Sequence, residues 1–127
     1  MTRPIRIVLV EDNDVFREAL ELLFSLRADV EVVGSTADGS RATDLCERLR
    51  PDVVLLDYRL PDLDGLKVAE TLRTSCPAVA VVMLSASVSG NEWRALEQAG
   101  VAAYLSKDED LETVVATLLR AAGRIPA

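Results

Sequence analysis

Residues 53–65 read VVLLDYRLPDLDG, and this stretch contains the features that decide the fold. The unbroken apolar run at residues 53–56 is typical of a strand that is buried on both faces of a sheet. Asp57 ends that run, Asp64-Gly65 closes the polar segment after it, and apolar residues then recur at helical spacing over residues 66–72. The stretch therefore predicts a buried strand, a turn that starts at a carboxylate, and a helix.

The same order of strand and helix recurs along the chain. Short apolar runs rich in Val and Ile predict five strands, at residues 5–10, 30–33, 53–56, 79–84 and 101–105. Helical periodicity predicts five helices in between and after them, at residues 16–26, 42–49, 66–72, 93–99 and 111–122. Five alternations of this kind predict an α/β domain in which helices cover both faces of a parallel sheet, with right-handed crossovers.

The composition is that of one globular domain that can bury its own core. The chain has 127 residues, of which 50% are hydrophobic, and carries a net charge of −7 with no histidine. The lack of histidine excludes a Ser-His-Asp relay and a zinc site built on imidazole within these residues, so any histidine chemistry comes from a partner. The acidic charge and the 4% aromatic content weigh against direct binding of nucleic acid.

The cysteines and the N-terminus indicate a cytoplasmic protein. Cys46 and Cys76 form no CxxC pair, which favours reduced thiols over a disulfide or a metal site. No apolar segment near Met1 resembles a signal peptide, and no run of about 18 apolar residues could span a membrane. We therefore expect no membrane association.

Acidic residues follow two of the predicted strands. Glu11 and Asp12 end the first strand and Asp57 ends the third, so the three carboxylates converge if these strands are neighbours. Two like charges about 4 Å apart repel by roughly 4 kcal/mol at an effective dielectric constant of 20. The cluster therefore needs either a proton or a cation, and oxygen ligands of this kind suit Mg²⁺.

Two polar residues at the other strand ends extend this predicted site. Ser85 ends the fourth strand and Lys107 follows the fifth, where a hydroxyl and an ammonium can hold the oxygens of a phosphoryl group. Asp57 is then the best candidate for a carboxylate nucleophile toward phosphorus. Each residue also has a simpler interpretation, as a helix cap, a turn residue or a solvated charge, and only their joint occurrence at the strand ends favours a site.

The chain resembles the receiver domains of two-component response regulators. The resemblance covers nearly the whole chain, and its motifs are Ile7 to Asp12, Val53 to Pro61, Asp64-Gly65, Val82 to Ala86 and Ala103 to Lys107. It implies a flavodoxin-like (βα)5 three-layer sandwich with a five-stranded parallel sheet in the order 2-1-3-4-5.

The resemblance also implies a role for each site residue. Asp57 would be the phospho-acceptor, and Asp12, Asp57 and the backbone carbonyl of Arg59 would bind Mg²⁺, with Glu11 contributing through water. The phosphate contacts would come from Lys107, Ser85, Ala86 and the Arg59 backbone.

The same resemblance also implies which residues transmit the signal and which tune the loss of the phosphoryl group. Ser85, which stands where many relatives have threonine, would act with Tyr104 as the switch that reports phosphorylation to the surface of the fourth helix, fifth strand and fifth helix. Tyr104 also has a simpler interpretation as an aromatic residue at the edge of the core. The side chains of Arg59 and Ser87 would tune autodephosphorylation, in a direction that the sequence leaves open.

A sensor histidine kinase is the partner that the resemblance implies. The segment from Tyr104 to Asp108 and the helix after it resemble receivers joined to LuxR-type helix-turn-helix domains. We therefore expect a receiver domain at residues 1–122, with residues 123–127 starting a linker to an output domain absent from this chain. DNA would be bound only through that domain, and a homodimer could form on phosphorylation. A single-domain regulator that acts by protein contact is the alternative.

Two other function classes agree less well with the sequence. A flavodoxin-like cofactor binder needs a hydroxyl- and glycine-rich phosphate loop after the first strand, where Glu11-Asp12 would instead repel a phosphate. A metal-dependent phosphatase that works through an aspartyl phosphate tends to have a second acid two positions after its nucleophile, where this chain has Arg59. We therefore expect a signalling switch that catalyses only its own phosphoryl transfer and dephosphorylation.

Overall fold

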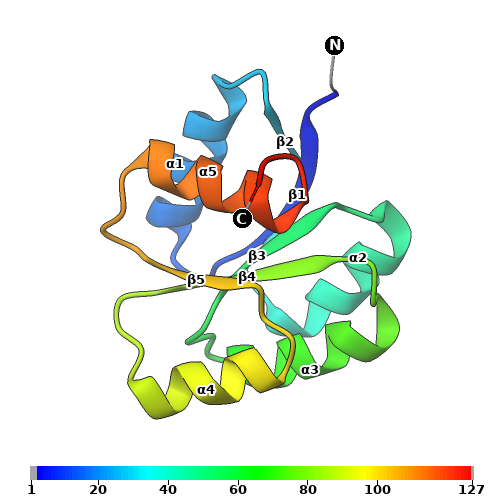
Figure 1. Ribbon diagram of the computed structural model, residues 1–127, viewed down its shortest axis with the longest axis vertical. Coiled ribbons are helices and arrows are strands. Elements are labelled where there is room, and N and C mark those ends of the chain that lie inside the picture. The colour runs from blue at the N-terminus through cyan, green and yellow to red at the C-terminus, as the bar shows by residue number, and fades with distance from the viewer. Residues whose placement is uncertain (1–2, 127) are drawn as a thin grey trace.

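The computed structural model describes residues 3–126, which form a five-stranded parallel sheet covered by helices on both faces (Figure 1). The strand order is β2-β1-β3-β4-β5, which confirms the expected flavodoxin-like topology. The elements in chain order are β1 (Ile5–Val10), α1 (Asp14–Ser25), β2 (Val30–Thr36), the short 3₁₀ helix η1 (Gly39–Arg41), α2 (Ala42–Leu49), β3 (Val53–Asp57), α3 (Gly65–Ser75), β4 (Ala80–Ser85), α4 (Gly90–Gln98), β5 (Ala103–Ser106) and α5 (Leu111–Ala121).

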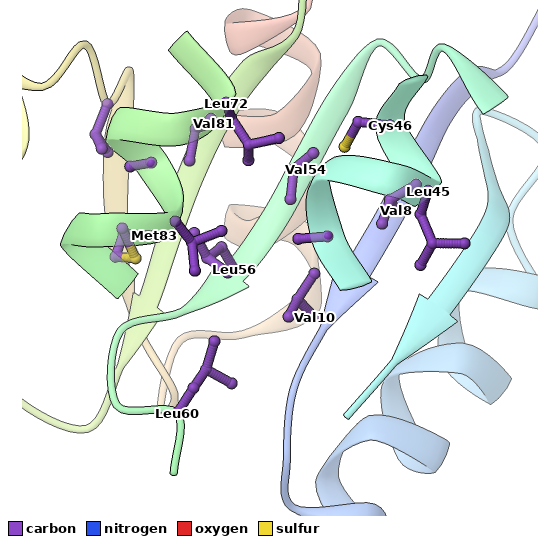
Figure 2. Close-up of a cluster of buried hydrophobic side chains, with 14 of the residues drawn as sticks. Val8, Val10, Leu45, Cys46, Val54, Leu56, Leu60, Leu72, Val81 and Met83 are labelled. Carbon is purple, nitrogen blue, oxygen red and sulfur yellow. The ribbon is translucent and has the colours of Figure 1, made fainter. Parts of the chain in front are cut away.

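Two hydrophobic cores lie on opposite faces of the sheet because successive strand residues point to opposite sides. Helices α1 and α5 cover one face, and α2, α3 and α4 cover the other (Figure 1). On β1, Ile7 and Leu9 pack in the core under α1 and α5, whereas Val8 and Val10 pack in the core under α2 and α3. Figure 2 shows the second core, with Leu45 and Cys46 of α2 and Leu72 of α3 over side chains of β1, β3 and β4.

Polar side chains define where four of the helices begin. Asn13, Asp64, Ser89 and Asp110 are the N-caps of α1, α3, α4 and α5, and each side chain accepts a hydrogen bond from a backbone N–H in the first turn. Asn13 precedes Asp14, the first residue of α1. These caps fix where the loops after the strands end, and the loops carry the candidate site.

The strand boundaries differ from the sequence-based prediction where backbone pairing overrides the apolar pattern. The prediction started the fifth strand at Val101, but the Val101 N–H bonds the carbonyl of Leu96, so this residue closes α4 and β5 begins at Ala103. The second strand continues beyond Val33 to Thr36, because Val10 pairs with Thr36 across the sheet. In residues 3–126 no helix has the length and hydropathy needed to span a membrane.

Candidate functional site

Three carboxylates meet at the edge of the sheet where its strands end. Glu11 and Asp12 follow β1 and Asp57 ends β3, and these strands pair directly, with Val10 opposite Leu56. One carboxylate oxygen from each acid lies within 4.8 Å of the other two. Glu11 and Asp57 are buried, whereas Asp12 is exposed. The convergence expected from the sequence is therefore present.

Lys107 supplies a positive charge inside this acidic cluster. Its Nζ lies 2.8 Å from Oε1 of Glu11 and 3.3 Å from Oδ2 of Asp57. The same ammonium lies 5.1 Å from the centre of the Phe16 ring, and the Lys107 N–H donates to the carbonyl of Ser85. The sequence left open whether a proton or a cation relieves the repulsion, and the structure provides one cation from the chain itself.

The surroundings of Asp57 make its carboxyl group hard to ionise. Burial raises the pKa of Asp57 to about 7, and the nearby charge of Glu11 acts in the same direction. The Arg59 N–H donates to Oδ1 of Asp57 over 3.1 Å, which opposes this rise by stabilising the carboxylate. Burial lowers the pKa of Lys107, but contacts with Glu11 and Asp57 outweigh it and raise the pKa above its usual value. Lys107 therefore stays charged.

Glu11 is held by one hydrogen bond and one ion pair. Its Oε2 accepts a hydrogen bond from the Asn13 N–H over 2.9 Å. Its Oε1 contacts Lys107 as an ion pair, and the side chain is buried. A buried carboxylate of this kind beside two further carboxylates fits a hydrated Mg²⁺ ion, which prefers oxygen ligands and keeps several of its waters.

Ser85 lies at the end of β4, on the strand next to β3, and is buried. Its hydroxyl donates to the carbonyl of Ser87 over 3.0 Å and accepts from the Ser87 N–H at 3.3 Å. Ala86 is exposed in the same loop. In this structure the Ser85 hydroxyl therefore bonds the β4–α4 loop, and its expected contact with a phosphoryl group stays a prediction.

Tyr104 lies on β5, on the side of the sheet that faces α4. Its ring centre is 5.7 Å from that of Trp93 on α4, with the planes inclined by 43°. Tyr104 remains 38% exposed. The side chain is therefore in an outward position, against a residue of the helix that the resemblance assigns to the output surface.

Glu92 is a contributor to the site region that the sequence analysis missed. Its Oε2 accepts from the Arg59 guanidinium at 3.4 Å, although 33 residues separate them. That guanidinium also lies over the Tyr58 ring, 5.2 Å from its centre. Ser89-x-x-Glu92 is a capping-box pattern, so the sequence indicated a helix start there but not the contact with Arg59.

A second missed contact shapes the loop after β3. The Asp62 carboxylate accepts from the backbone N–H groups of Gly39 and Ser40, which ties this loop to the start of η1. Gly65 lies so close to the loop that a Cβ there would be 2.7 Å from the Cα of Tyr58. The bonds of the Asp62 side chain to backbone N–H groups and the close approach at Gly65 therefore hold this loop in place.

Two sizeable hollows of the structure lie away from the acidic cluster. One of 630 Å³ runs along the outer edge of β2, and one of 610 Å³ lies near Cys46 and Cys76, at the opposite end of the sheet. In the cluster of Glu11, Asp12 and Asp57 one carboxylate oxygen of each residue lies within 4.8 Å of the others, a spacing that suits a small ion.

Comparison with known proteins decides the family. Residues 7–119 match the response regulator receiver domain. The chain belongs to this family. The signal receiver domain of NarL from Mycobacterium tuberculosis has a TM-score of 0.90 and 34% identity to this chain, and the match covers 96% of this chain and 98% of that one.

Relatives of this receiver domain include LuxR-type regulators. A DNA-binding response regulator of the LuxR family from Staphylococcus aureus has a TM-score of 0.86 at 26% identity, over 93% of this chain and 98% of the other. The transcriptional regulatory protein LnrK of Bacillus subtilis is 34% identical over 116 residues, which are 91% of this chain and 52% of LnrK. The chain thus spans about half the length of the curated relatives it matches.

Proposed function

We propose that this receiver domain is a phosphorylation-dependent switch in which Asp57 accepts a phosphoryl group from a sensor histidine kinase. The observation that carries the proposal is the convergence of Glu11, Asp12 and Asp57 around the ammonium of Lys107. A carboxylate is a competent nucleophile toward phosphorus, and the neighbouring cation can take up the charge of the incoming oxygens.

In the proposed transfer, an oxygen of Asp57 bonds to the phosphorus of a phosphohistidine on the kinase. The phosphorus–nitrogen bond breaks and the imidazole nitrogen keeps the electron pair. Since this chain has no histidine, the donor imidazole belongs to the partner. Lys107, Ser85 and the backbone N–H groups of Arg59 and Ala86 hold the phosphoryl oxygens.

The residues that would hold Mg²⁺ are Asp12, Asp57 and the Arg59 carbonyl, with Glu11 acting through a water. The approach of one carboxylate oxygen from each of Glu11, Asp12 and Asp57 to within 4.8 Å of the other two supports this assignment. When bound, the ion supplies positive charge that neutralises the carboxylates and the phosphoryl oxygens. Because the pKa of Asp57 is raised to about 7, added positive charge favours the ionised form that acts as nucleophile.

Switching follows from the new charge on Asp57. A phosphoryl group adds strong acceptors, for which the Ser85 hydroxyl leaves the Ser87 carbonyl that it now bonds. Tyr104, which is partly exposed against Trp93, then moves into the space vacated near Ser85. This motion changes the surface of α4, β5 and α5.

We place the output function in a further domain of the kind that the longer relatives have room for. Residues 1–122 are the proposed receiver and residues 123–127 the start of a linker to a DNA-binding output domain. Support comes from relatives about twice the length of this chain, LnrK being named a transcriptional regulatory protein. The proposal includes a cytoplasmic location and dimerisation on phosphorylation. The receiver itself catalyses only its own phosphoryl transfer and dephosphorylation.

The test is incubation of the purified chain with acetyl phosphate and Mg²⁺, followed by mass spectrometry of the intact protein. We expect a mass gain of one phosphoryl group, lost in Asp57→Asn and on chelation of Mg²⁺ by EDTA. Asp108→Asn is the matched control, because Asp108 is exposed at the same edge of the sheet. Uptake by Asp57→Asn, or no uptake by the wild type from either acetyl phosphate or a phosphorylated histidine kinase, contradicts the proposal.

Fluorescence of Trp93, the one tryptophan of the sequence, reports the switch in the same samples. Because Tyr104 lies 5.7 Å from it, we expect the emission to change on phosphorylation of the wild type and not in Asp57→Asn. Unchanged emission in fully phosphorylated protein contradicts the assigned motion of Tyr104.

A further inference from the structure

Arg59 begins beside the acceptor, yet its charged end points elsewhere. Its backbone N–H donates to Oδ1 of Asp57 over 3.1 Å. Its guanidinium instead reaches Glu92 at the start of α4, with an N–O distance of 3.4 Å, and lies over the Tyr58 ring. An arginine two residues from a nucleophilic carboxylate is thus held away from it by a residue of another element.

Glu92 divides its two carboxylate oxygens between two structures. Oε1 accepts from the Ser89 N–H at 2.9 Å, while the Ser89 hydroxyl accepts from the Glu92 N–H, which completes the capping box of α4. Oε2 is the oxygen that contacts Arg59. One side chain therefore fixes the first turn of α4 and also ties that turn to the loop that follows the acceptor strand.

The first turn of α4 is attached to the rest of the molecule through Trp93 as well as through Glu92. Leu96 is its one buried side chain among residues 90–98. Gly90, at the first helical position, has no atom within 4 Å of where its Cβ would be. Glu92 therefore shares the positioning of the α4 start with Trp93, which packs against the core and against Tyr104.

We propose that Glu92 is a positioning residue that withholds the Arg59 guanidinium from the phosphorylated Asp57 and so shortens the lifetime of the phosphoryl group. This inference rests on the proposed function and adds to it a residue that controls how fast the phosphoryl group is lost from Asp57. Arginine is always charged and binds phosphoryl oxygens in a bidentate manner, so an Arg59 released from Glu92 is drawn to the aspartyl phosphate.

The step controlled in this way is hydrolysis. A water oxygen bonds to phosphorus, the bond between phosphorus and the Asp57 oxygen breaks, and the carboxylate keeps the electron pair. Inorganic phosphate leaves, and the excess proton of the water passes to solvent. A guanidinium paired with the phosphoryl oxygens covers the solvent-exposed side from which water approaches, whereas Glu92 keeps that side open.

The experiment compares Glu92→Gln with the wild type after removal of acetyl phosphate, following loss of the phosphoryl group by intact-protein mass spectrometry. Glutamine can still complete the capping box, so the substitution removes the charge and spares the helix start. We expect the phosphorylated half-life to lengthen about threefold, the size expected for loss of one partly exposed ion pair. Glu97→Gln, which removes an exposed charge from the same helix, should leave the half-life unchanged.

The Arg59→Ala background isolates the mechanism. There, Glu92→Gln should have no further effect, because no guanidinium remains to be released. A half-life for Glu92→Gln equal to that of Glu97→Gln, a shortened half-life, or a lengthening that survives in Arg59→Ala would each overturn the inference while leaving the proposed function intact.

A wild type that is never phosphorylated overturns the proposed function, and the positioning role with it.

Discussion

Lys107 and Arg59 are two cations beside the same carboxylate, and they are directed in opposite ways. Lys107 lies between Glu11 and Asp57, with its side chain 25% exposed. The Arg59 side chain is 61% exposed and is paired with Glu92 on the neighbouring helix. The buried acceptors of the sheet edge hold the first cation, and a carboxylate outside the site holds the second.

This difference shows how burial separates a permanent contact from an adjustable one. Charges near Asp57 interact in a medium of low effective dielectric constant, where losing one partner leaves the others uncompensated. The pair between Arg59 and Glu92 is solvated, and such pairs contribute about 0–1 kcal/mol. Removing Lys107 should therefore lower the free energy of unfolding by more than removing Arg59, whose pair with Glu92 can be broken at little cost.

The largest expected effect concerns the charge of Asp57 and its dependence on pH. The pKa of Asp57 is about 7 in the folded chain and near 3.8 when the group is unperturbed. A raised folded-state pKa contributes stability that is fully present below pH 3.8 and is lost as the pH rises through about 7. The wild type should thus lose up to about 4 kcal/mol between pH 4 and 8 relative to Asp57→Asn.

Urea unfolding in EDTA at each pH measures this difference. Asp108→Asn serves as the control, and its free energy of unfolding should run parallel to that of the wild type. If the free energies of unfolding of the wild type and Asp57→Asn also run parallel over this range, the surroundings of Asp57 do not raise its pKa. The claim that burial governs the charges around Lys107 then fails.

The next effect in size is the loss of the cation inside the acidic cluster. Lys107→Met keeps the apolar stem of the side chain but leaves Glu11 and Asp57 without positive charge. We expect the free energy of unfolding at pH 7 to fall by about 2 kcal/mol, since uptake of a proton by Asp57 limits the cost. The only other lysine of the sequence, Lys67, is exposed on α3, so Lys67→Met should change it by less than about 0.5 kcal/mol.

The smallest expected effect is that of removing the exposed cation. Arg59→Ala should change the free energy of unfolding by no more than about 0.5 kcal/mol, because the pair with Glu92 is solvated. The same urea titrations measure it. A loss as large as that of Lys107→Met would show that the pair is a structural element, and the distinction between a permanent and an adjustable contact would disappear.

Most of the fold could be predicted because it follows from local periodicity. Unbroken apolar runs such as residues 53–56 are typical of strands that are covered on both sides, and five alternations with amphipathic helices leave few topologies. The prediction went wrong at strand ends, where hydrogen bonds decide. Val101 is as apolar as a strand residue, but its N–H closes α4.

Some residues of the candidate site could be predicted from the sequence and others could not. Glu11, Asp12, Asp57 and Lys107 could be brought together from the sequence because strand ends of a parallel sheet share one edge. Glu92 could not, since it reaches Arg59 from a different loop and its pattern signals only a helix cap. The contact depends on where α4 lies against the sheet, and periodicity carries no information on that.

The sequence by itself determined the element types, the residues at the strand ends and the sign of their charges, because these depend on local pattern and composition. Only the tertiary structure decided the environment of each charge: that Lys107 enters the cluster, that Glu11 is buried, and that Arg59 turns outward. Burial and distance set the strength of an electrostatic contact, and both arise only when segments far apart in the chain pack together.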